Sequence, residues 1–249
     1  MQRFLFERRK DNREFPLLDV KLDQWRLWAM LIFISVAMLI WMALGAVLDF
    51  HGFLSQLIFI NFLPVAIIVA GLIYLSQGQL TKLFGKPRLG DFGFAVIMLI
   101  LQGAYAILIS ILLGNVGISL GQNAAATEIE NAASKTTEYG QNLITDLFDL
   151  LGEELLSIII FLTVAALLIQ YYHMGRRSGL TVAMLASMFL FGFLHFEAYN
   201  WNLIQMFIVI AGERFFLNGV FIRSKTIWPS YITHMLFDAV AFAVALAQH

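Results

Sequence analysis

The chain has 249 residues, of which 60% are hydrophobic and only 13% charged, with a net charge of −1 and a mean hydropathy of +0.79. A soluble domain carries about 25% charged residues, so this composition excludes a soluble globular protein and predicts an all-α, polytopic membrane helix bundle with no nucleic-acid partner. The absence of cysteine excludes disulfides and thiolate metal sites.

The chain opens with a charged, amphiphilic segment over residues 1–26 that has no apolar region followed by a small-residue cleavage site. We interpret it as solvated or lying at the membrane interface. Three apolar stretches then follow at 27–48, 53–76 and 92–113, and each reaches the roughly 20 residues that a membrane-spanning helix needs. Residues 49–52 should form a short turn. Pro64 should kink the second span, and a neighbouring group must then bind the carbonyl that proline leaves free.

Residues 114–147 form the longest polar stretch, which is acidic and ends in a segment with apolar residues at helical spacing. We predict an acidic loop and an interfacial helix that runs into the fourth span. The remaining spans are expected at about 150–172, 180–196, 203–222 and 227–247. Together these spans make residues 148–249 a second membrane unit after the three helices of 27–113.

The lysines and arginines are distributed very unevenly over the loops. With seven spans, Lys135 alone lies on one side and Arg214 lies inside a span. All the others share the opposite side: Arg3, Arg8, Arg9, Lys10, Arg13, Lys21, Arg26, Lys82, Lys86, Arg88, Arg176, Arg177, Arg223 and Lys225. The positive-inside rule therefore predicts a cytoplasmic N-terminus, with His249 and the acidic 114–147 loop outside, in a cell membrane that we expect to be bacterial.

A set of ionisable residues interrupts three of the last four spans, where charge is costly and usually functional. Glu153 and Glu154 open the fourth span, His195 ends the fifth, and His234 and Asp238 lie one turn apart in the seventh. A carboxylate beside an imidazole can deprotonate water, and a second imidazole can stabilise an oxyanion. This set therefore permits amide hydrolysis within the membrane.

Each of these residues also has a structural interpretation. His195 alone could be an interfacial histidine, and the glutamates could form the polar edge of their span. Asp238 could pair with Arg214, and Glu213 with Arg214. Because four or five such groups coincide in spans otherwise nearly free of charge, we favour a functional site. Glu154, His195 and His234 could also bind a divalent metal such as zinc, since two histidines and a glutamate form a known catalytic set.

The same residues carry a family resemblance over about residues 145–245. Glu153-Glu154, Phe191-Gly-Phe-Leu-His195 and His234-Met-Leu-Phe-Asp238 resemble the three motifs Glu-Glu-x-x-x-Arg, Phe-x-x-x-His and His-x-x-x-Asn/Asp of the CPBP family. This family contains the CAAX prenyl proteases and the bacteriocin-processing, or Abi, proteins. The resemblance implies an intramembrane protease, either a metalloenzyme or a glutamate-type enzyme. In such a protease Glu153 or Glu154, together with His195, would activate water. His234 and Asp238 would stabilise the oxyanion or complete the site.

One position departs from the family pattern, because Ile158 stands where the first motif has arginine. We hypothesise that Arg214, from the sixth span, supplies the missing cation as a supporting residue.

Three functions compete at this stage. The first is an endopeptidase acting on a peptide or membrane-tethered protein, in bacteriocin maturation or self-immunity. Processing of prenylated substrates fits less well, because the site would open toward the outer half of the bilayer. The second is a catalytically impaired immunity or binding protein, which Ile158 favours. The third is a proton-coupled carrier, which we rank last because no inverted halves or paired broken helices are evident.

Overall fold

The computed structural model describes residues 3–48 and 52–247, and throughout these ranges the regular structure is helical. The turn predicted at 49–52 falls mostly outside the described residues, as does His249. Within the described ranges seven helices are long and apolar enough to cross a membrane, which confirms the predicted all-α polytopic bundle. They are Gln24–Val47, Phe53–Leu75, Leu89–Asn115, Lys135–Tyr171, Arg176–Leu194, Gln205–Ser224 and Ile227–Val244.

Several of these spans are composite. The first is α1 (Gln24–Val47), and the second joins α2 (Phe53–Gln56), the π-helical η1 (Leu57–Phe62) and α3 (Leu63–Leu75). A short 3₁₀ turn, η2 (Gln79–Phe84), leads to α4 (Leu89–Asn115). The polar region holds α5 (Ala124–Asn131). The last four spans are α6 (Lys135–Ala166) with π-helical η3 (Leu167–Tyr171), α7 (Arg176–Leu194), π-helical η4 (Gln205–Ile210) with α8 (Ala211–Ser224), and α9 (Ile227–Ala247).

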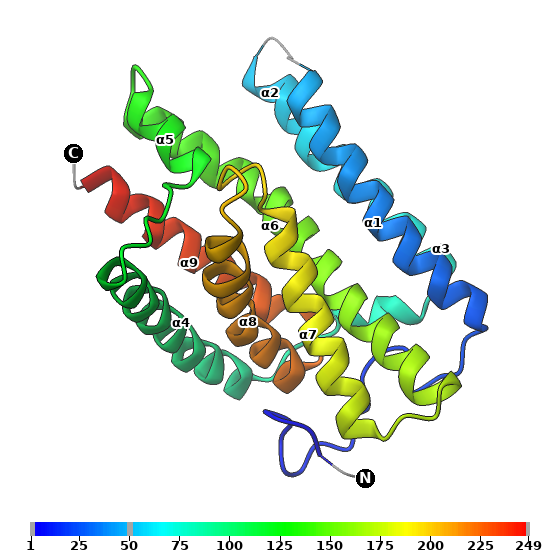
Figure 1. Ribbon diagram of the computed structural model, residues 1–249. Coiled ribbons are helices and arrows are strands. Elements are labelled where there is room, and N and C mark those ends of the chain that lie inside the picture. The colour runs from blue at the N-terminus through cyan, green and yellow to red at the C-terminus, as the bar shows by residue number, and fades with distance from the viewer. Residues whose placement is uncertain (1–2, 49–51, 248–249) are drawn as a thin grey trace.

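Helix α6 is the centre of the bundle. It packs against α7, α9 and α1, while α4 packs on the far side against α8 and α9 (Figure 1). Most side chains from Leu150 to Ala166 are buried. The predicted interfacial helix and fourth span are thus one helix of 37 residues with η3. At 1.5 Å per residue it is about 55 Å long, more than the roughly 30 Å hydrocarbon core.

The kink predicted at Pro64 has an identifiable partner. Proline at 64 cannot donate to the carbonyl of Ile60, four residues earlier, and the preceding turn is π-helical. The indole Nε1 of Trp41 on α1 donates to this carbonyl at 2.6 Å, in the buried interior. The neighbouring helix therefore satisfies the freed backbone group, as the sequence required.

The N-terminal segment differs from the prediction of a solvated or interface-lying tail. Phe15 and Leu17 are fully buried. Phe15 packs edge-on against Phe161 of α6 and lies 6.3 Å from the ring of Phe221 of α8. The segment therefore covers one end of the bundle, opposite the end that carries α5 (Figure 1).

Ion pairs join this segment to each of the three basic turns. Glu7 contacts Arg176 at 2.8 Å and Lys225 at 3.2 Å. Asp11 contacts Arg88 at 3.4 Å, and the Lys82–Asp19 pair is 2.6 Å long. The basic turns therefore share one end of the molecule, as the charge distribution requires.

Candidate functional site

The two adjacent glutamates of α6 point to different surroundings. Glu154 is fully buried and forms a two-pronged ion pair with Arg214 of α8, in which Nη1 contacts Oε1 and Nη2 lies 3.2 Å from Oε2. Arg214 is itself fully buried. A bidentate arginine–carboxylate pair fixes the orientation of both groups. Within the described chain Arg214 thus pairs with Glu154, and not with Glu213 or Asp238.

A polar chain continues from this pair into the bundle. The Nε of Arg214 donates to Oδ1 of Asn218 at 3.2 Å, the amide of Asn218 lies 3.4 Å from the hydroxyl of Ser187, and that hydroxyl donates to the carbonyl of Ser157. The chain crosses α8, α7 and α6. It holds the guanidinium in one position, as a buried charge requires.

Ile158 is fully buried in the main hydrophobic core. It lies one turn after Glu154, at the position where the family motif has arginine. The cation at Glu154 comes instead from α8, so the carboxylate is paired although the motif arginine is absent.

Glu153 faces the two histidines. Its Oε2 lies 3.9 Å from Nε2 of His195 and 3.9 Å from Nε2 of His234. The second ring also approaches two other carboxylates: Nδ1 of His234 lies 3.2 Å from Oε1 of Glu154, and Nε2 lies 3.7 Å from Oδ2 of Asp238. The structure thus brings together all five residues that the sequence predicted, from α6, the end of α7, and α9.

The histidine tautomer at 195 follows from its backbone contact. Nδ1 of His195 lies 2.8 Å from the carbonyl oxygen of Phe191, one turn earlier. A carbonyl can only accept, so Nδ1 carries a hydrogen, and in the neutral ring the lone pair is on Nε2, the nitrogen toward Glu153. The ring of Phe191 lies 4.6 Å from that of His195 and 5.8 Å from that of His234, with the guanidinium of Arg214 over its face at 5.2 Å. This contact explains the Phe-x-x-x-His spacing.

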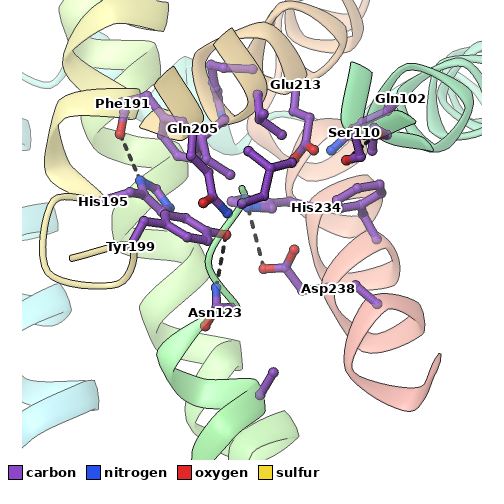
Figure 2. A pocket seen from close by; sticks show the side chains of 18 of the residues that line it. Gln102, Ser110, Asn123, Phe191, His195, Tyr199, Gln205, Glu213, His234 and Asp238 are labelled. Carbon is purple, nitrogen blue, oxygen red and sulfur yellow. Dashed lines mark hydrogen bonds and ion pairs between the residues drawn. The ribbon is translucent and has the colours of Figure 1, made fainter. Parts of the chain in front are cut away.

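Phe191, His195, His234 and Asp238 border a cavity of about 350 Å³, which is within the usual size of a small-ligand site. Glu153 lines a different pocket, with Asn61 and Asp149. His195, His234 and Asp238 line one part of it, and Figure 2 shows their side chains around the space. The cavity reaches across the bundle to Gln102 and Ser110 of α4 and to Glu213 of α8.

Part of the wall comes from residues that the sequence did not single out. The side-chain amide of Gln205 bonds both backbone groups of Gly121, at 2.7 and 2.8 Å. Asn123 donates to the hydroxyl of Tyr199 at 3.2 Å (Figure 2), and the Tyr199 ring is stacked on His195. Polar side chains inside apolar spans, such as Gln102 and Gln205, were the available signal.

Tyr199 follows α7, in the segment that leads to η4. Burial raises the pKa of its hydroxyl above the usual range, while the hydrogen bond from Asn123 opposes this effect. The hydroxyl therefore keeps its proton at neutral pH. Since it accepts from Asn123, its own hydrogen is free for a group in the cavity.

The donor geometry does not fit a metal. No group of three or more histidine, aspartate or glutamate side chains in the described residues is arranged to hold an ion. In the set predicted from sequence, Glu154, His195 and His234, both oxygens of Glu154 are held by Arg214. The free carboxylate beside the histidines, that of Glu153, has its Oε2 3.9 Å from the Nε2 of each ring. Ligands about 2.0–2.1 Å from zinc in a tetrahedron lie closer together than this.

Residues 139–240 match a protein-family model described as type II CAAX prenyl endopeptidase Rce1-like. The match spans α6 to α9 and contains all three motifs, which confirms the resemblance to the CPBP and CAAX protease family in this part of the chain. This part of the chain is therefore similar to the CAAX-type membrane proteases. No curated protein sequence and no solved structure matches the chain.

Proposed function

We propose that the protein is an intramembrane endopeptidase that cleaves a peptide or a membrane-tethered protein, with Glu153 as the general base. The single observation that carries this assignment is the position of Glu153 Oε2, equally distant from the Nε2 atoms of His195 and His234. Glu154, held by Arg214 and fully buried, is a positioning residue.

In this mechanism a water donates one hydrogen bond to Glu153 and one to the lone pair on His195 Nε2. Glu153 takes the proton as the water oxygen attacks the scissile carbonyl, and the proton then passes to the leaving amine. His234, whose Nδ1 faces Glu154, presents Nε2 toward the developing oxyanion. Asp238 orients that ring, and the Tyr199 hydroxyl is a further donor on the cavity wall.

The test is hydrolysis of a quenched-fluorescent peptide library by the purified protein in liposomes. We expect Glu153→Gln to lower the cleavage rate by at least about 10²- to 10⁴-fold, the usual contribution of a general base. Glu128→Gln, which changes an exposed carboxylate on α5, is the matched control and should cleave at the normal rate. Equal rates for the two variants would refute the assignment. An immunity phenotype that survives Glu153→Gln would support a binding protein instead.

The mechanism routes no step through a metal. Cleavage should therefore persist after dialysis against 1,10-phenanthroline, with metal content measured on the same sample. Loss of cleavage that zinc restores would contradict the assignment and revive the metalloprotease alternative.

Bacteriocin maturation or self-immunity is the biological setting that we propose for this activity. Gly121, Asn123 and Ala126, in and just before α5, line the cavity, and α5 lies at the end of the bundle opposite the N-terminal segment (Figure 1). With the basic turns in the cytoplasm, a substrate entering from the outer half of the bilayer is favoured over a prenylated protein on the cytoplasmic face.

A further inference from the structure

Glu213 is an acid of the cavity that the proposed mechanism does not use. It precedes Arg214 on α8, and adjacent residues of an α-helix point about 100° apart. Arg214 therefore turns to Glu154 while Glu213 lines the cavity. Within the described residues no lysine, arginine or histidine lies within ion-pair distance of its carboxylate. A carboxylate inside a membrane protein ordinarily pairs with another group of the protein or binds a ligand that enters the site.

Gln102 lies on α4 and lines the same cavity. Its side chain is 1% exposed, and it has no hydrogen-bond partner in the described part of the chain, with Oε1 buried and unpaired. Leaving a buried amide unpaired is unfavourable, so such a group is expected to have a ligand. In Figure 2 the side chains of Gln102 and Glu213 approach the cavity from different helices.

Among the described residues, this cavity offers acids but no unpaired lysine or arginine. Glu213 and Asp238 line it and Glu153 borders its histidines, whereas Arg214, its arginine, is already neutralised by Glu154. A ligand with a positive charge can therefore pair with an acid of this cavity. The cavity's volume of about 350 Å³ also accommodates a long side chain beside a peptide backbone.

We propose that Glu213 and Gln102 form a specificity subsite that binds a lysine or arginine side chain of the peptide substrate. Glu213 pairs with the cation, and Oε1 of Gln102 accepts one of its hydrogen bonds. Such a side chain is available where a membrane-spanning substrate meets the interface, because long basic side chains carry their charge toward water. This subsite rests on the proposed protease function, and its α4 half lies outside residues 139–240.

The test compares two peptides that differ only in lysine or norleucine at one scanned position. We expect wild type to prefer lysine in kcat/KM at that position. Glu213→Gln should lower kcat/KM for the lysine peptide by about 10- to 100-fold, as expected for a lost charged hydrogen bond, and leave the norleucine peptide unchanged. Gln102→Leu should lower kcat/KM for the lysine peptide several-fold. Glu197→Gln, an exposed acid next to the site, is the control.

Two further experiments separate a failure of the subsite from a failure of the protease function. Glu213→Lys should shift preference to a glutamate peptide, a gain that misfolding cannot produce. Binding of the uncleaved peptides to Glu153→Gln protein tests the subsite without catalysis. If lysine and norleucine peptides bind and react alike, the subsite is refuted while the protease stands. If nothing is cleaved but lysine binding depends on Glu213, the subsite stands and the protease falls. A preference that vanishes when the peptide's N-terminus is acetylated would refute the side-chain assignment.

Discussion

At the scale of single residues, the adjacent pair Glu153-Glu154 divides into two environments. One carboxylate faces the histidines across 3.9 Å, and the other is buried against an arginine. Since neighbouring helix residues point about 100° apart, one Glu-Glu step can supply both a group that faces the histidines and a group that anchors the site. The sequence predicted which residues cluster but left open which glutamate takes which place, because that depends on the helices packed around α6.

Arg214 gives the first prediction. Arg214→Met leaves Glu154 as an uncompensated buried charge, which should lower the free energy of unfolding by about 3–5 kcal/mol and reduce cleavage. Adding Ile158→Arg places an arginine one turn from Glu154, where the family motif has it, and i,i+4 residues are neighbours. We expect the double variant to recover part of both losses.

The measurement is thermal unfolding of the purified protein together with its peptide cleavage rate. Ile158→Arg alone, which buries a second arginine without a free carboxylate, should destabilise the protein and serves as the control. If the double variant were no better than Arg214→Met, the idea that the arginine is interchangeable between α6 and α8 would fail.

At the scale of helices, the second span shows how much a local rule can predict. Pro64 required that some neighbour bind the freed carbonyl, and Trp41 does so. The rule could not name Trp41, because α1 and α3 come together only in the fold. The same limit applies to the π-helical turns and to the N-terminal segment. In that segment Phe15 and Leu17 stand among charges without periodicity and are nevertheless buried.

The Trp41–Ile60 bond gives the second prediction. Trp41→Phe removes the donor and leaves a buried carbonyl unpaired, which should cost about 1–3 kcal/mol of stability. Pro64→Ala restores a backbone N–H that can reach this carbonyl. It should therefore destabilise the wild type little and relieve part of the loss in Trp41→Phe. A double-mutant cycle from unfolding midpoints checks the coupling, and additive effects of the two changes would count against it.

The N-terminal segment gives the third prediction, through Asp11. Burial raises the pKa of this carboxyl, but hydrogen bonds and charge from Arg13, with the charge of Lys225, outweigh it and lower the pKa to about 2 from an ordinary 3.8. A carboxylate with a lowered pKa stabilises the fold above its unfolded pKa, and this contribution disappears as the pH falls through the folded value.

We therefore expect the unfolding midpoint of the solubilised protein to fall between about pH 4 and about pH 2. Asp11→Asn should lower the unfolding midpoint at neutral pH. It should also make the fall of that midpoint between about pH 4 and about pH 2 smaller. Asp23→Asn, which removes an exposed carboxylate near the same segment, controls for net charge. If Asp11→Asn left the fall of the midpoint at acid pH unchanged, this carboxylate would not be the source of the pH dependence.

At the scale of the whole molecule, the two ends of the bundle differ in chemistry. The N-terminal segment and the three basic turns form an ion-paired end, and the cavity opens among α4, α8 and α9 toward the end with α5. The motifs covered only residues 145–245, so the sequence could not assign a role to the first three spans. The structure shows that α4 contributes Gln102 to the cavity wall and α1 contributes Trp41 to the packing of the second span.

The orientation of these ends in the membrane is the last prediction. The positive-inside rule places the basic turns in the cytoplasm and α5 outside. Because the chain has no cysteine, a single cysteine can be introduced without removing any other. Lys86→Cys lies on an exposed basic turn and Ser134→Cys on the exposed loop before α6. In intact cells an impermeant maleimide should label Ser134→Cys alone. After the cells are opened both variants should react, which controls for accessibility. Labelling of Lys86→Cys in intact cells would reverse the orientation. It would place the cavity toward the cytoplasm, where prenylated proteins would become the favoured substrates.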